Sequence, residues 1–145
     1  MASRRRLTEL GRALRRELKP IIEKGKQEGS CYGDFGGACG LMSYALYTAL
    51  KRLGRKPVLA LAGPPTQSFQ HCWVEVDGLI VDLTATQFGY TKPVQITTRP
   101  SEWHKPLKFK GRRVITEIKR WVGSQSPLRH RRAIESAVNR VLEAA

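Results

Sequence analysis

The chain is short of cysteine and has no long apolar run. Its three cysteines are an odd number without metal-ligand spacing, so we expect reduced thiols in a cytoplasmic protein that uses no metal or other cofactor. No stretch approaches the roughly 20 apolar residues of a membrane span. The basic residues after Met1 lead into an amphipathic segment rather than the apolar core of a signal peptide, so secretion is not expected.

Acidic residues are also scarce, and the resulting charge is unevenly spread. The 145 residues include 26 Lys and Arg against 12 Asp and Glu, a net charge of +14. Residues 1–30 carry nine basic and four acidic side chains, residues 31–98 five and four, and residues 99–145 twelve and four. The length fits one domain, with a nearly neutral core between two basic flanks. Such flanks favour an acidic partner, whether protein, nucleic acid or anionic lipid. Oligomeric state is left open.

Both flanks are predicted to be helical. In the first, Pro20 should kink the helix or start a second short one, and residues 25–30 form a linker. In the second, Ser126-Pro127 marks a helix start, followed by a basic cluster over residues 129–132. We expect helices docked on the core with solvated basic faces rather than a dedicated nucleic-acid surface. The apolar stripe of the first consists of Leu7, Leu10, Leu14, Leu18, Ile21 and Ile22.

The rest of the chain predicts short strands and irregular segments. Residues 57–61 and 94–98 are expected strands. Residues 99–110 contain two prolines and should be irregular, whereas residues 113–122 fit either a strand or a helix.

A β-hairpin is expected between Gln70 and Phe88. Two runs rich in Val, Ile, Trp and Leu flank Asp77-Gly78, a dipeptide that favours a two-residue turn. In that register Val76 faces Leu79, Trp73 faces Asp82, and His71 faces Thr84. Alternation then gives one face the side chains of His71, Trp73, Glu75, Ile80, Asp82 and Thr84. His71 and Asp82 become diagonal neighbours roughly 7 Å apart, so the carboxylate can orient the imidazole.

A helix over about residues 40–53 follows from apolar residues at helical spacing, and Gly54 should end it. Cys39 lies at its start, where unpaired amides and the positive end of the dipole stabilise a thiolate. Glycines at 33, 36, 37 and 40 leave the surrounding backbone open to a substrate carbonyl. Cys39, His71 and Asp82 therefore form a candidate nucleophile, base and orienter.

Each of these residues also has a structural explanation. Cys39 could be a small buried apolar residue, His71 a strand histidine with a satisfied ring, and Asp82 the acceptor of a backbone amide. The conjunction of the three favours catalysis. Cys31 is the rival thiol, while alternation turns Cys72 away from His71 and predicts a core role. The two other histidines, His104 and His130, are expected in solvent.

A cysteine opening a helix, followed by HCWVEVDG and VDLT, resembles the transglutaminase-like branch of the papain-like cysteine hydrolases, and is similar to the leader peptidases of lasso-peptide biosynthesis. The resemblance covers residues 31–88. It implies an α+β fold with the cysteine helix packed on an antiparallel sheet, and the triad Cys39, His71 and Asp82. The sequence departs from that pattern at Gly40, Cys72 and Leu83, where relatives often carry Trp, Ala and Pro.

The predicted chemistry is attack of the Cys39 thiolate on an amide, giving a thioester. The Cys39 amide, with Gly37 and Gly40 beside it, supplies the oxyanion donors. Trp73 is a candidate wall of the site, although core packing is favoured. Hydrolysis of a protein or peptide is preferred over transglutaminase-type transfer, which uses the same residues, because no second domain is evident. The alternative is a non-catalytic protein that binds nucleic acid or another acidic partner through its flanks, but few aromatics interleave with the basic runs.

Overall fold

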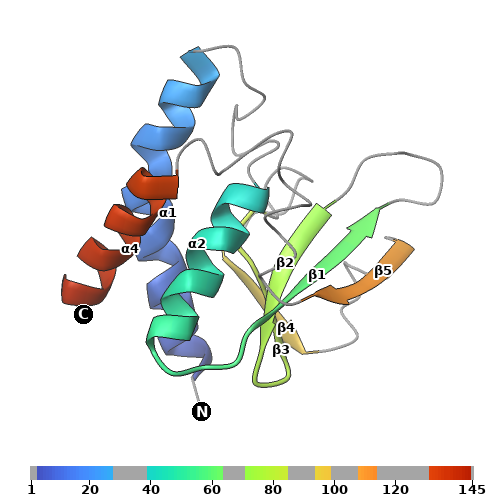
Figure 1. Ribbon diagram of the computed structural model, residues 1–145. Coiled ribbons are helices and arrows are strands. Elements are labelled where there is room, and N and C mark those ends of the chain that lie inside the picture. The colour runs from blue at the N-terminus through green and yellow to red at the C-terminus, as the bar shows by residue number, and fades with distance from the viewer. Residues whose placement is uncertain are drawn as a thin grey trace.

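The computed structural model describes residues 3–27, 39–63, 71–84, 94–98, 108–113 and 131–144 (Figure 1). In this part of the chain, helices form one layer beside an antiparallel sheet, so the predicted α+β class is confirmed. The elements are α1 (Arg4–Gln27), α2 (Cys39–Arg52), β1 (Val58–Gly63), β2 (His71–Val76), β3 (Leu79–Asp82), β4 (Gln95–Thr98), β5 (Lys108–Arg113) and α4 (Arg131–Ala144).

The sheet has five strands in the order β4-β3-β2-β1-β5, and every neighbouring pair is antiparallel. The strands predicted at residues 57–61 and 94–98 are confirmed as β1 and β4. The prediction of an irregular segment through residue 110 is wrong at its end, because β5 begins at Lys108 and pairs with β1. Backbone pairing with an existing edge, rather than an apolar pattern of its own, makes KFKGRR a strand.

The hairpin of β2 and β3 has the predicted turn and register. Asp77 and Gly78 both have positive φ, 51° and 75°, as a type I′ turn requires. Val76 pairs with Leu79, Glu75 with Ile80, and Val74 with Val81. Continuing this register by one residue brings Trp73 opposite Asp82.

The helix predicted from apolar spacing is α2, and it ends as expected. Gly54 has a φ of 78°, its amide donates to the Lys51 carbonyl, and the Arg55 amide donates to the Leu50 carbonyl. This pair of bonds is a Schellman motif, which satisfies carbonyls that the end of a helix would otherwise leave without donors.

The N-terminal flank is one helix, α1, that runs through Pro20. The predicted second short helix is therefore wrong, and so is the linker for residues 25–27, which are helical. Burial of the apolar stripe on both sides of Pro20 stabilises the helix against the lost backbone hydrogen bond. The stripe packs inward, and the described Lys and Arg side chains of α1 other than Arg15 are exposed, which confirms a docked helix. Its fully buried members are Leu7, Leu14, Leu18 and Ile22.

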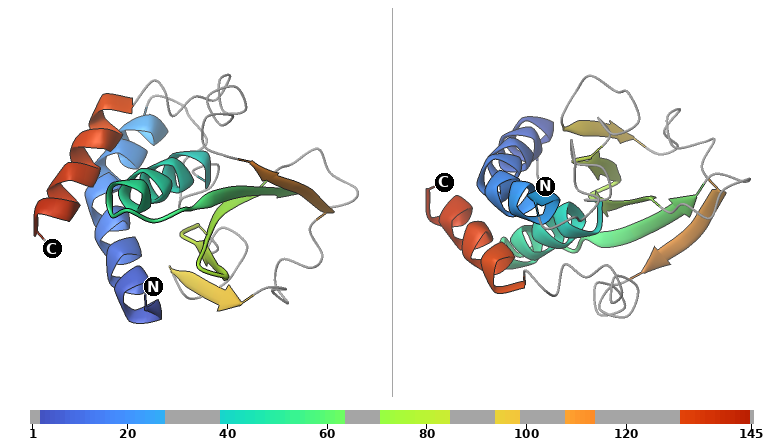
Figure 2. Two further views of the ribbon diagram at one scale, coloured as in Figure 1. Left: turned by 60° about the horizontal axis from the view of Figure 1, so that its bottom comes forward. Right: turned by 90° about the horizontal axis from the view of Figure 1, so that it is seen from above.

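The central helix α2 contacts β1 and β2 on one side and α1 and α4 on the other (Figure 2). One large hydrophobic cluster joins the three helices to the facing side of the sheet. The sheet contributes Leu59, Cys72, Val74, Val76, Val81 and Leu83 to it. The opposite face carries a smaller cluster of Ala60, Trp73 and Ile80, as the predicted alternation requires.

The C-terminal flank is helical from Arg131, and its predicted start at Ser126-Pro127 lies outside the described residues. None of the described helices combines the length and apolar character that crossing a membrane requires.

Gly11 sets how closely α1 approaches the sheet. A Cβ added there would lie 2.8 Å from Leu83 Cδ2 and 3.0 Å from both methyl groups of Val94. Gly11→Ala is therefore expected to lower the free energy of unfolding by about 1 kcal/mol, since overpacking outweighs the gain in helix propensity. Urea unfolding measures this. Arg12→Ala, at the exposed next position, should stay within about 0.5 kcal/mol of the parent. A stabilised Gly11→Ala protein would contradict the close approach.

Candidate active site

Cys39 is the first residue of α2, at the helix start that the sequence predicted. The side chains of Cys39 and His71 lie outside what the structure describes. The same holds for residues 31–38, which include Cys31 and Gly37. Gly40 follows in the first turn. His71 is the first residue of β2, and Asp82 is the last residue of β3.

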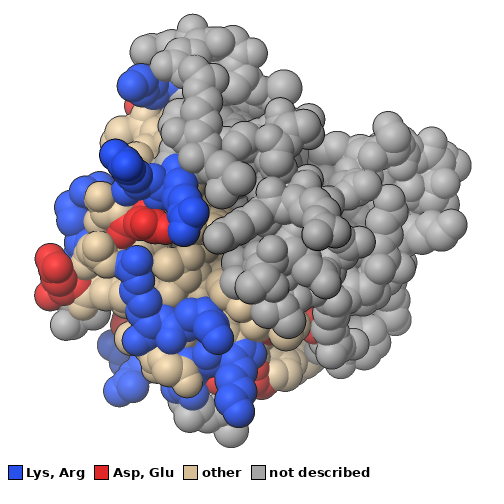
Figure 3. All heavy atoms as spheres, in the orientation of Figure 1, with Lys and Arg blue, Asp and Glu red and all other residues tan. Residues whose placement is uncertain are grey.

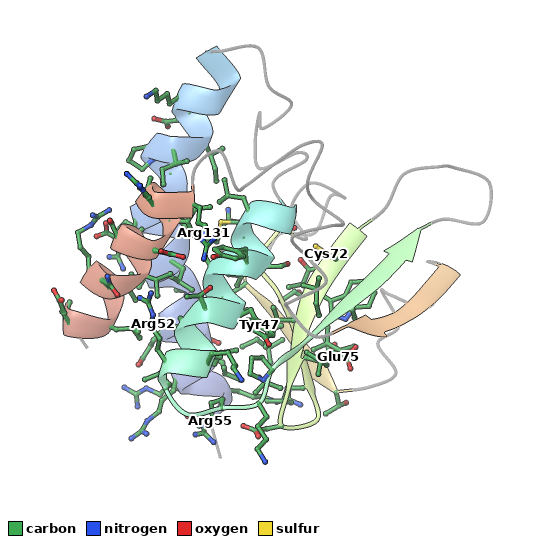
Figure 4. All side chains as sticks on the ribbon, in the orientation of Figure 1. Tyr47, Arg52, Arg55, Cys72, Glu75 and Arg131 are labelled. Carbon is green, nitrogen blue, oxygen red and sulfur yellow. The ribbon has the colours of Figure 1, made fainter. Side chains whose placement is uncertain are left out.

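A buried contact joins α2, one turn after its start, to the start of β2. Ser43 Oγ lies 3.4 Å from both the carbonyl oxygen and Sγ of Cys72. Ser43 is one turn, roughly 6 Å, beyond Cys39, and Cys72 is the neighbour of His71. The start of α2 and the start of β2 thus lie at the same end of the described fold (Figure 1). Cys72 is 1% exposed, which confirms its predicted core role (Figure 4).

Antiparallel pairing brings the end of β3 to this same end of the sheet. Asp82 is 1% exposed there, and its Oδ1 accepts hydrogen bonds from the Thr84 amide at 3.0 Å and the Thr84 hydroxyl at 3.4 Å. The backbone contact foreseen as the structural explanation for Asp82 is therefore present. The contact with Thr84 engages Oδ1 of Asp82 and orients the carboxylate. Oδ2 takes no part in the hydrogen bonds with Thr84.

The sheet face covered by α2 is the one that carries Cys72, not Trp73. The predicted alternation gave His71 the same face as Trp73, which is the face that α2 does not cover. The hairpin pattern alone contained no information about which face the helix covers.

Two other candidates are buried in the sheet. Trp73, a possible wall of the site, is 1% exposed and packs with Ala60 and Ile80, in agreement with the favoured core role. Glu75 shares the predicted face with His71 and is the next carboxylate that could orient it in place of Asp82; it is also buried, but it lies four residues along β2, roughly 13 Å from His71. Glu75 is therefore too distant to orient the His71 ring.

Arg15 is the residue at this end of the sheet that sequence reasoning missed. From α1 it donates a hydrogen bond from Nη1 to the carbonyl oxygen of Leu83. Burial lowers the pKa of Arg15, and the negative charge of Asp82 acts in the opposite direction. One turn earlier on the same face is Gly11, whose close approach lets Arg15 reach the sheet. That Gly-x-x-x-Arg spacing was the available signal.

The first half of α2 is also held from α4. Tyr44 Oη donates to Glu135 Oε1 at 3.1 Å, and Arg131 Nε donates to the same oxygen at 3.0 Å (Figure 4). The bond from Arg131 is the main reason that the pKa of Glu135 lies below its ordinary 4.5, and the bond from Tyr44 adds to it. Burial, followed by the bond to Glu135, raises the pKa of Tyr44.

Within the described ranges, no three His, Cys, Asp or Glu residues gather as a metal site would require. Comparisons with protein-family models, with curated proteins and with solved structures found no match. The chemical assignment of the site therefore depends on its geometry and sequence.

Arg15→Met tests the link between α1 and the end of β3. It keeps much of the aliphatic stem but leaves the Leu83 carbonyl without this donor and Asp82 without a nearby positive charge. The free energy of unfolding in urea should fall by about 1–3 kcal/mol. Arg12→Met, on the exposed face of the same helix, is the matched control and should have little effect. Equal effects of the two substitutions would show that Arg15 has no special role.

Glu135 predicts a pH dependence of stability. Because its folded pKa is depressed, the stabilisation is complete above the ordinary value of 4.5 and is lost as the pH falls through the folded pKa. Glu135→Gln should therefore be less stable than the parent at neutral pH, and the gap should shrink at a pH well below 4.5. Urea unfolding at both pH values measures the gap. Glu143→Gln, at an exposed position of α4, is the control, and a Glu135→Gln gap of equal size at both pH values would contradict the prediction.

Proposed function

We propose that this chain is a cysteine-nucleophile amide hydrolase, a peptidase or protein deamidase of transglutaminase-like, papain-like type. Cys39 is the nucleophile, His71 the general base and acid, and Asp82 the group that orients His71. The observation that carries the proposal is the Ser43–Cys72 contact, which puts the start of the cysteine helix beside the start of the histidine strand. Asp82 ends the adjacent strand at the same end of the sheet.

The reaction proceeds through a thioester. The Cys39 thiolate attacks the amide carbon, and His71 gives its proton to the leaving nitrogen as the C–N bond breaks. His71 then takes a proton from water, whose oxygen attacks the thioester. The C–S bond breaks, releasing a carboxylic acid and restoring the thiolate. An amine in place of that water would make the reaction a transglutamination.

The start of α2 supports both steps. The backbone amides of Cys39 and Gly40 belong to the first turn, where helix amides lack intrahelical acceptors. They are candidate donors to the oxyanion that develops on the attacked carbonyl, and the positive end of the helix dipole favours the same charge. Arg15 stabilises the end of β3 next to Asp82 and is therefore a positioning residue in this scheme.

Alkylation with a low dose of iodoacetamide near neutral pH, mapped by mass spectrometry, tests the nucleophile. Cys39 should react first because an activated thiolate reacts faster than a thiol. Cys72 should react last because it is 1% exposed. His71→Ala should slow the alkylation of Cys39 by about tenfold, since the thiolate loses its cationic partner.

The two other histidines provide matched controls. His104→Ala and His130→Ala should leave the Cys39 rate within about twofold of the parent. Preferential labelling of Cys31, equal labelling of all three cysteines, or an unchanged Cys39 rate in His71→Ala would overturn the assignment. A Cys39 rate that fell equally in all three histidine variants would point to a general structural effect instead.

A further inference from the structure

At the other end of α2, about 20 Å from Cys39 along the helix, the three helices enclose a groove of about 950 Å³. This volume lies at the upper end of the range for small-molecule pockets. α1 forms one wall and the last turns of α4 the other. The floor is apolar, formed by Leu10, Ala13, Leu50, Leu53, Val141 and Leu142.

Leu53 is the residue of this floor whose side chain is most clearly exposed to solvent. Among the residues that the structure describes, it is the exposed large hydrophobic side chain, with 55% of its surface accessible. It follows the last turn of α2, just before the Schellman glycine, so its position is fixed by a well-ordered helix end. An exposed leucine in a hollow lined by other apolar side chains is typical of a surface that binds a partner.

Arginines surround the apolar floor. Arg55 Nη1 lies 3.4 Å from Asp77 Oδ2, and Arg140 Nε lies 3.0 Å from Glu17 Oε2, so each of these arginines forms an ion pair. Arg6 and Arg16 also line the groove, and within the described part of the chain neither forms an ion pair. Lys and Arg side chains gather over the helical layer around it (Figure 3). Glu9 and Glu17 also line the groove, but Glu9 pairs with Arg5 and Glu17 with Arg140, so Arg6 and Arg16 leave an excess of positive charge beside the apolar floor.

We propose that this groove binds an amphipathic helix of a partner protein whose apolar stripe is flanked by acidic residues. A helix of the partner fits between α1 and α4, with its apolar stripe on the leucine floor and its carboxylates beside the arginines. A second copy of this chain carries the same net charge of +14 and lacks the required acidity. Nucleic acid is disfavoured because the described residues of the lining include no aromatic side chain on which a base could stack.

The groove is separate from the basic cluster at residues 129–132 of the C-terminal flank, because Arg131 and Arg132 do not line it. The groove lies at the opposite end of α4, and Arg131 is engaged by Glu135. The proposal does not depend on hydrolase activity, because the groove and Cys39 lie at opposite ends of α2.

Fluorescence anisotropy of the full chain with labelled synthetic peptides tests the proposal. The probe is a helix of about four turns with leucines at i, i+3, i+4 and i+7 and glutamates beside them. One control has the same composition in permuted order, and another has lysines in place of the glutamates. The acidic amphipathic peptide should bind at least about tenfold more tightly than either control.

Substitutions in the chain locate the binding. Leu53→Ser should weaken binding at least about fivefold, because it removes apolar contact without changing charge. Arg6→Glu with Arg16→Glu should weaken it about as much and reduce its salt dependence. Arg4→Glu with Arg12→Glu changes the charge of the same helix by the same amount at exposed positions outside the groove, and should leave affinity within about twofold. Urea unfolding checks that each variant folds, and the Cys39 alkylation rate should not change.

Several outcomes would overturn the proposal. Equal binding of the permuted peptide, or equal weakening by the Arg4 and Arg12 pair, would mean diffuse charge attraction. Failure of all three peptides to bind would remove the groove as a helix site. Self-association in sedimentation that Leu53→Ser abolishes would assign the groove to a second copy. Binding to phosphatidylglycerol vesicles that Leu53→Ser abolishes and the acidic peptide does not displace would assign it to a lipid surface.

Discussion

The two-residue turn at Asp77-Gly78 determines which side chains of the central strands face the helices. Both residues adopt positive φ, and the register that follows places Cys72, Val74 and Val81 in the main core. Because strand side chains alternate with a period of two, a slip of one residue would exchange this set for the face of Trp73 and Ile80. The packing of α2 depends on this register, and through the Ser43–Cys72 contact so does the relation between the cysteine helix and the histidine strand.

Much of the fold could be predicted because local patterns and tertiary packing agree. The apolar spacing of α2, its glycine cap and the hairpin are each encoded within a few residues. Distant contacts outweighed a local rule at two places. Pro20 starts no second helix, because Leu18 and Ile22 on either side of it are both buried in the same helix. Residues 108–110 are not irregular, because the open edge of β1 supplies backbone partners that the local sequence cannot reveal.

The candidate site could be predicted only in part, for a similar reason. Chain order and hairpin register suggested that Cys39, His71 and Asp82 belong together, and the positions of the three backbones are compatible with that prediction. Which face of the sheet α2 covers depends on three-dimensional packing. The period of two in a strand sequence separates the side chains of the two faces, but it does not show which face packs against the helices. Arg15 was missed because Arg12 and Arg16 are identical in type, and its spacing from Gly11 has a meaning only once the approach of Gly11 to Leu83 and Val94 is known.

The ion pair between Glu17 and Arg140 spans 123 residues of sequence and lies where α1 packs against α4. During synthesis α1 emerges before α2 and the sheet, whereas α4, which completes the described helical layer, is made after them. The face of α1 that contacts α4 must therefore stay uncovered until α4 is made, and closing a contact across 123 residues carries a large cost in chain entropy.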